Sequence, residues 1–225
     1  MLKGIKKTLV NAIKLIIVVL FGASICRMLC SRKERTKTLI NLVWNNIQDD
    51  LVKELGLPKV PELKFETLDG ALACTQCAYV YNGWFDKTIA ATQSDFVIRV
   101  DIDKVATCID AYRIMARKPF SGIEKAVIQQ ILAHETRHVW QAHGDFYIGT
   151  KIPMFDTSFL SGYGLKREEL DANEYAVRFA RNDKERIVAM HFKACQENAG
   201  TISAALGFKE NQRKLAKRVR EVYSK

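Results

Sequence analysis

The feature that most constrains the fold is a segment at residues 121–143, which combines an apolar helical face with a pair of histidines. Apolar residues recur at helical spacing along it, at Val127, Ile131, Leu132 and Val139. Ser121-Gly-Ile-Glu124 at its start is a capping-box pattern, which predicts where the helix begins. His134 and His138 are four residues apart, so both imidazoles lie on one helical face and can reach one ion.

Glu135, the first of the three residues between these histidines, indicates what such an ion would do. Zinc accepts imidazole nitrogen at about 2.0–2.1 Å in tetrahedral geometry, and a catalytic site keeps one position for water. Because Glu135 directly follows His134, it points beside the ion and can take a proton from that water. A chance match in the core or on the surface is the alternative. The predicted helix and the apolar Ile-Leu-Ala before His134 favour a zinc site.

A third ligand has to come from elsewhere in the chain. The metzincin continuation would place Gly three residues after His138 and His or Asp six residues after it, but Gln141 and Gly144 stand there. Glu169 lies thirty-one residues downstream of His138, on a helix predicted at 166–181. A carboxylate on a second helix that crosses the first would complete the site.

The helix that carries Glu169 has a face suited to close packing. Small residues occur three and seven positions after Glu169, at Ala172 and Ala176. Asn173, one turn after Glu169, can hydrogen-bond a metal ligand. The rival ligand Glu174 lies on another face of the helix, and we expect Glu168 and Asp171 to be surface charges.

The two motifs together resemble a known group of enzymes. His-Glu-x-x-His followed by the pattern E-x-x-A-[DN]-x-[FY]-A resembles the gluzincin arrangement of zinc peptidases, and the Asn variant is similar to the ImmA/IrrE-like metallopeptidases. The resemblance covers about residues 90–181. It implies a zincin-like domain with Zn²⁺ bound by His134, His138 and Glu169, and Glu135 as the catalytic acid/base. Many gluzincins have Asp where this chain has Asn173.

The remaining segments predict an α+β, mainly helical domain. Between residues 64 and 103, aromatic and β-branched runs separated by turn residues predict a small antiparallel sheet. We expect the strand at Phe96–Ile102 to form a sheet edge along which an extended peptide pairs. Cys74 and Cys77 are interpreted as packed residues on or near a strand, with a redox pair or half a metal site as alternatives. Further helices are predicted at 36–55, 183–198 and 209–223.

Residues 1–37 differ in character from the rest. The run Leu15–Cys26 is apolar and uncharged, and extending it back to Leu9 gives eighteen residues. A membrane-spanning helix needs roughly 20, so we predict an N-terminal hydrophobic helix that anchors the chain, with a cleaved signal or a surface or buried helix as alternatives. Four basic residues precede the run and five follow it, which leaves the orientation undecided. The predicted organisation is an anchor segment at 1–37 and a metallopeptidase domain at 38–225.

Charge argues against a nucleic-acid partner. The net charge is +10, but residues 1–37 hold nine basic and one acidic residue and residues 209–225 hold seven and two. The body between them has nineteen basic and twenty-two acidic residues. A mildly acidic body with basic ends lacks the basic face of a nucleic-acid-binding domain.

The sequence therefore predicts a membrane-tethered zinc peptidase that acts on a protein or peptide. The same zinc centre also suits an esterase or amidase, because an activated water does not dictate which bond is attacked. The other alternative is a non-catalytic membrane-associated module with a structural or degenerate motif. The intact Glu135 favours an enzyme, since a structural site has no need of a carboxylate there.

Overall fold

The computed structural model describes residues 31–76, 96–117, 122–143, 167–198 and 205–225. Within these ranges the chain is mainly helical with one small sheet, so the predicted α+β class is confirmed. In chain order the elements are α2 (Arg32–Leu55), β1 (Glu62–Phe65), β2 (Ala73–Gln76), β3 (Val97–Val100), α3 (Ile102–Ala116), α4 (Ile123–His143), α6 (Arg167–Phe179), α7 (Asp183–Asn198) and α8 (Ala205–Ser224). The predicted cap Ser121 and the residue Cys77 lie outside the described residues.

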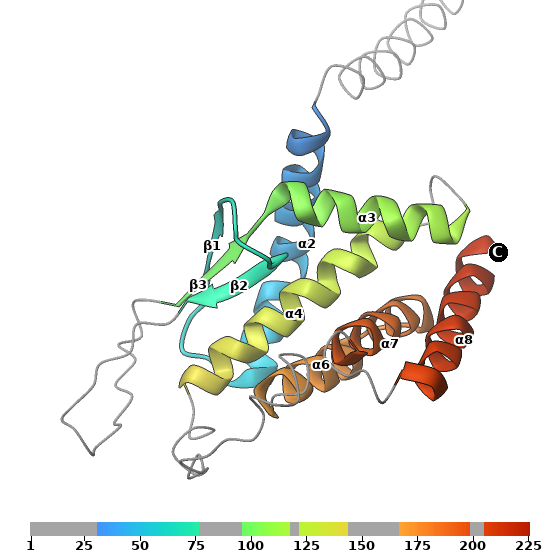
Figure 1. Cartoon of the computed structure of the whole chain (residues 1–225). Helices are drawn as coiled ribbons and strands as arrows, with labels where there is room; N and C mark the ends of the chain where they lie inside the picture. Colours follow the sequence, from blue (N-terminus) through green and yellow to red (C-terminus); the bar gives the residue numbers. More distant parts are fainter. Residues whose placement is uncertain (1–30, 77–95, 118–121, 144–166, 199–204) are drawn as a thin grey trace, which may run out of the picture.

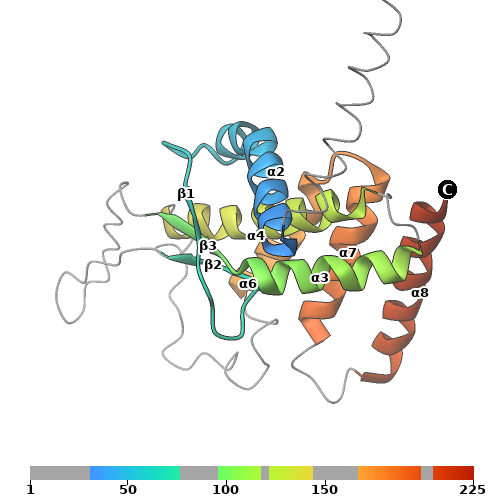
Figure 2. The ribbon, with the colours of Figure 1, turned by 90° about the horizontal axis from the view of Figure 1, so that it is seen from above.

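Helix α4 is the central element. It contacts α2, α3 and β2 as well as α6 and α7 (Figure 1). Figure 2, turned by 90°, shows α2 crossing over α4 and α3 running alongside it. Every residue from Ala126 to Thr136 is buried. A helix that is buried on all sides has to find partners inside the protein for its polar side chains, and α4 carries the histidine pair.

The sheet differs from the sequence prediction in two respects. Its order is β1-β3-β2, with β1 parallel and β2 antiparallel to β3. The sheet is therefore mixed, and the prediction of an antiparallel sheet is wrong. β3 is the central strand because its buried side chains, Ile98 and Val100, make it the most apolar of the three. The expectation that this strand forms an edge is also wrong, because β3 lies between β1 and β2. In the described part of the sheet, β2 is an edge strand, and it contacts α4.

Local side-chain chemistry determines where two helices begin. α2 starts at Arg32, four residues before the predicted start, because the Ser31 hydroxyl accepts a hydrogen bond from the Glu34 amide at 3.1 Å. Asp101 caps α3 by accepting from the amides of Asp103 and Lys104. The same carboxylate accepts from the Leu68 amide at 3.1 Å, which ties the β1–β2 loop to the start of α3.

The predicted anchor at residues 15–26 lies outside the described residues. Among the helices that the structure describes, none combines the length and the apolar character needed to cross a bilayer. α2 runs continuously through the predicted boundary between residues 37 and 38. The boundary and the membrane anchor stay predictions.

Candidate metal centre

The two histidines of α4 and one glutamate of α6 converge on a single point. Nε2 of His134 lies 3.1 Å from Nε2 of His138 and 3.3 Å from Oε2 of Glu169. Nε2 of His138 lies 3.5 Å from Oε1 of Glu169. Ligand atoms bound tetrahedrally at zinc–ligand distances of about 2.0–2.1 Å are separated by about 3.3–3.4 Å. The three side chains therefore have the spacing of three corners of a tetrahedral metal site.

Packing of α6 against α4 places Glu169. The α6 face that carries Glu169 also carries Ala172 and Ala176, and both alanines are buried. Their small side chains allow the two helix backbones to approach closely, which brings the carboxylate to the histidines. Glu174, the rival ligand, is exposed and pairs with Lys193 of α7. Helical phase thus separates the two glutamates as the sequence predicted.

The orientation of His138 is fixed by Gln141, which is fully buried. The side-chain amide nitrogen of Gln141 donates to the backbone carbonyl of Glu168 at 2.9 Å and to the carboxylate of Asp171 at 2.8 Å. Both partners are acceptors, so the amide oxygen must face Nδ1 of His138, 2.7 Å away. Nδ1 then carries the ring proton, and the lone pair of Nε2 points to the other two ligand atoms.

Asp171 is held in turn by Arg137. The guanidinium donates to both carboxylate oxygens, at 2.7 and 3.1 Å, and lies 3.6 Å from the centre of the Trp140 ring. Burial alone would raise the pKa of Asp171, but the hydrogen bonds from Arg137 and Gln141 hold it below its ordinary value. Asp171, predicted to be a surface charge, is partly exposed, with 24% of its side chain accessible, and its carboxylate also supports the side chain that orients a histidine.

Electrostatics at the site favour a cation. Burial by itself lowers the pKa of His138, but the hydrogen bond that its imidazole donates to Glu169, together with the negative charges of Glu135 and Glu169, raises it to about 9. The carboxylates thus outweigh the cost of placing a positive charge in a buried position. The same field would attract a metal ion, which competes with the proton for Nε2.

Glu135 lies beside the three ligand atoms with only 6% of its surface exposed. The Thr75 hydroxyl of β2 lies 2.9 Å from its Oε2 and 2.8 Å from its backbone carbonyl oxygen. A cavity of about 510 Å³ opens onto His134, Glu135 and Glu169. The other walls come from the β1–β2 loop, β2, α4 and α7, through Asp69, Gly70, Ala71, Leu72, Ala73, Ile131, Phe192 and Gln196.

Asn173 is fully buried on α6, one turn after Glu169. Both polar atoms of its side chain, and Nδ1 of His134, have no hydrogen-bond partner among the described residues. Nδ1 of His134 is a donor when Nε2 holds a metal, and the amide oxygen of Asn173 is an acceptor. The predicted role of Asn173 as a partner of a metal ligand is chemically consistent with this and stays a prediction.

Sequence reasoning missed the supporting roles of Gln141 and Thr75. In the sequence Gln141 marks a departure from the metzincin pattern, although its position three residues after His138 places it near that imidazole. Thr75 gives no local signal, because it reaches Glu135 across sixty residues of chain.

The arrangement offers three possible metal-ligand atoms, a buried carboxylate beside them and an adjoining cavity. A structural zinc site is closed by four protein ligands, whereas a catalytic site has three and an open position. In the described part of the chain, His134, His138 and Glu169 form the one such group whose ligand atoms all lie within 4.8 Å of one another.

No protein-family model, curated protein or solved structure matches this chain.

Proposed function

We propose that this chain is a zinc-dependent peptidase of the gluzincin type, similar to the ImmA/IrrE-like metallopeptidases. The observation that carries the proposal is the position of Glu135, buried beside three convergent ligand atoms at the wall of a cavity. His134, His138 and Glu169 would hold Zn²⁺, since two imidazoles and a carboxylate are a donor set that zinc accepts.

Hydrolysis of a peptide bond assigns a separate task to Glu135. Zinc, when bound, would act as a Lewis acid: it would lower the pKa of a water molecule that it binds to about 7 and would polarise the substrate carbonyl. Glu135 takes one proton from the attacking water, whose oxygen adds to the carbonyl carbon. It then returns that proton to the amide nitrogen as the carbon–nitrogen bond breaks. Burial of Glu135 keeps bulk water away from this transfer.

The cavity supports a substrate with an apolar side chain next to the bond that is cleaved. Leu72, Ile131 and Phe192 supply apolar wall surface beside the ligand atoms. An extended peptide would pair with β2, which has β3 as its one strand neighbour among the described residues. An ester or a side-chain amide would meet the same catalytic groups, but neither would pair with that strand.

Attachment to a membrane is part of the proposal. It rests on the apolar run Leu15–Cys26 with basic residues on both sides. We expect the full-length chain to sediment with membranes and to resist extraction by high salt, because an inserted helix is held by apolar burial. Release by salt alone would instead indicate electrostatic adsorption of the basic ends.

The decisive experiment compares the full-length wild type with Glu135→Gln. Zinc is measured by elemental analysis, and hydrolysis is measured with fluorescein-labelled casein and with quenched peptides that carry an apolar residue. We expect about one zinc per chain in both proteins, and a loss of cleavage of about 10²- to 10⁴-fold in the variant, since the positioned base is gone. Cleavage that survives unchanged in Glu135→Gln, or a folded wild type that takes up no zinc, would refute the proposal.

A further inference from the structure

The edge strand β2 is joined to the proposed catalytic base by one side chain. Thr75 is on β2 and Glu135 is on α4, and the Thr75 hydroxyl lies 2.9 Å from Oε2 of that glutamate. Ala73, two residues earlier on the same strand face, lines the cavity. Cys74 between them pairs in register with Arg99 of β3 and belongs to the opposite face of the strand. Thr75 thus reaches the site from the strand that borders it.

The Thr75 hydroxyl has a single proton and two acceptor oxygens within reach. The second is the Glu135 backbone carbonyl oxygen, at 2.8 Å. Within α4 this carbonyl already faces the amide four residues later, as in any α-helix. An ionised carboxylate accepts a stronger hydrogen bond than a neutral carbonyl. The Thr75 hydroxyl therefore donates its proton to Oε2 of Glu135 in preference to the backbone carbonyl oxygen.

From this geometry we propose that Thr75 is a positioning residue for the base, a role that rests on the proposed function. By donating to Oε2, Thr75 fixes the carboxylate plane and leaves Oε1 as the oxygen that receives the proton of the attacking water. A base has to be held within hydrogen-bond reach of the proton that it takes, and a small displacement is costly to the reaction rate. Thr75 then holds the Glu135 carboxylate in a fixed position relative to strand β2.

The test uses the full-length protein loaded with zinc and two substitutions at one position. Thr75→Val keeps the β-branched shape and loses the hydroxyl, and Thr75→Ser keeps the hydroxyl. We expect Thr75→Val to lower kcat for casein by about 10- to 100-fold, which corresponds to one hydrogen bond to a charged group. KM and zinc affinity should change by no more than about twofold, because the ligand set is intact. Thr75→Ser should recover most of the rate.

A binding measurement supports the kinetic one and needs no turnover. Acetohydroxamic acid binds zinc and shares its acidic proton with a neighbouring base. We expect its dissociation constant to rise about tenfold in both Thr75→Val and Glu135→Gln, and to stay near the wild-type value in Thr75→Ser. Thr107→Val is the matched control, because the Thr107 hydroxyl donates within α3 to the Asp103 carbonyl, away from this cavity. Should casein not be cleaved, the hydroxamate measurement decides.

Three outcomes separate this inference from the proposed function. If Thr75→Val matches the wild type while Glu135→Gln is impaired, Thr75 merely ties β2 to α4 and the inference is wrong. Loss of zinc or of folding in Thr75→Val, without rescue by serine, would equally assign a packing role. If Glu135→Gln itself keeps full cleavage and hydroxamate affinity, the proposed function fails and the inference fails with it.

Discussion

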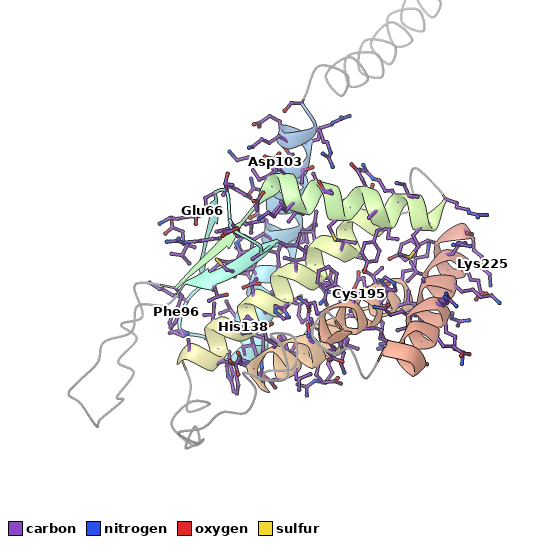
Figure 3. All side chains as sticks on the ribbon, in the orientation of Figure 1. Glu66, Phe96, Asp103, His138, Cys195 and Lys225 are labelled. Atoms are coloured by element: carbon purple, nitrogen blue, oxygen red, sulfur yellow. The ribbon has the colours of Figure 1, made fainter. Side chains whose placement is uncertain are left out.

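Two helix interfaces in this protein each bury histidine, and they shift its pKa in opposite directions. At the first, between α4 and α6, His138 faces Glu169 and Glu135 and has a pKa of about 9. At the second, between α3 and α7, burial alone lowers the pKa of His191. Figure 3 labels His138 where α4 meets α6, and Cys195 on α7, the helix of the second interface.

The partners of His191 explain the difference. The Tyr112 hydroxyl lies 2.8 Å from Nδ1 of His191, and the ring of Tyr112 meets the imidazole edge-on. Cys195, one turn further along α7, places its sulfur 3.8 Å from the same nitrogen. These partners are neutral, so the imidazole stays neutral as well. Burial of a histidine therefore does not make a cation site by itself; converging carboxylates do.

The largest expected effect tests whether convergence of charge defines the site. Glu169→Ala removes a ligand, and we expect zinc affinity to fall by more than roughly 100-fold, beyond what loss of a supporting residue costs. Glu174→Ala, on another face of α6, and His191→Ala, at the neutral interface, should leave the affinity within about threefold. Competition with a chromogenic chelator measures all three in one buffer. Loss of zinc from Glu174→Ala with retention in Glu169→Ala would reverse the assignment.

A smaller effect is expected from the hydrogen bond that orients His138. Gln141→Leu removes the acceptor at Nδ1, so the imidazole is no longer fixed, and we expect zinc affinity to fall by about 10- to 100-fold. Gln129→Leu is the matched control on the same helix, because the Gln129 amide donates to Glu185 and not to a metal ligand. Equal zinc affinity in the two variants would show that the contact with Gln141 does not support the site.

The cluster of His134, His138 and Glu169 could be predicted from the sequence because its members obey local rules. His134 and His138 follow helical spacing within one element. Glu169 follows from the small residues that share its face, which identify the side of α6 that packs closely. Both arguments use a 3.6-residue period and need no long-range information.

The supporting residues and the sheet order depend on which elements meet, and the sequence alone does not provide that. Thr75 becomes a partner of Glu135 only because β2 is the sheet edge that contacts α4. β3 lies in the centre of the sheet, between β1 and β2. Burial of Ile98 and Val100 there outweighs the tendency of strands that are consecutive in the chain, such as β1 and β2, to pair with each other. Asp171 looked like a surface charge because its partner Arg137 is thirty-four residues away on another helix.

The smallest expected effect concerns the neutral interface and its dependence on pH. The pKa of His191 in the folded protein is below its ordinary value of 6.5. Between those two values the unfolded chain binds a proton that the folded chain does not bind. The free energy of unfolding therefore rises with pH in this window: the contribution of neutral His191 is complete above about pH 6.5 and is lost as the pH falls towards the folded pKa.

The residues that face His191 do not titrate in that window. Burial raises the pKa of the two partners of His191, Tyr112 and Cys195, above their ordinary values. It also raises the pKa of Cys108, which interacts electrostatically with both partners, to about 11. His191→Gln keeps a polar side chain and removes the titrating group. In urea unfolding with a chelator present, the stability difference between wild type and variant should shrink from pH 7.5 to pH 5. The contributions of His134 and His138 are common to both proteins and cancel. Parallel stability curves would mean that His191 binds a proton in the folded protein as readily as in the unfolded chain, and the contrast between the two interfaces would then be lost.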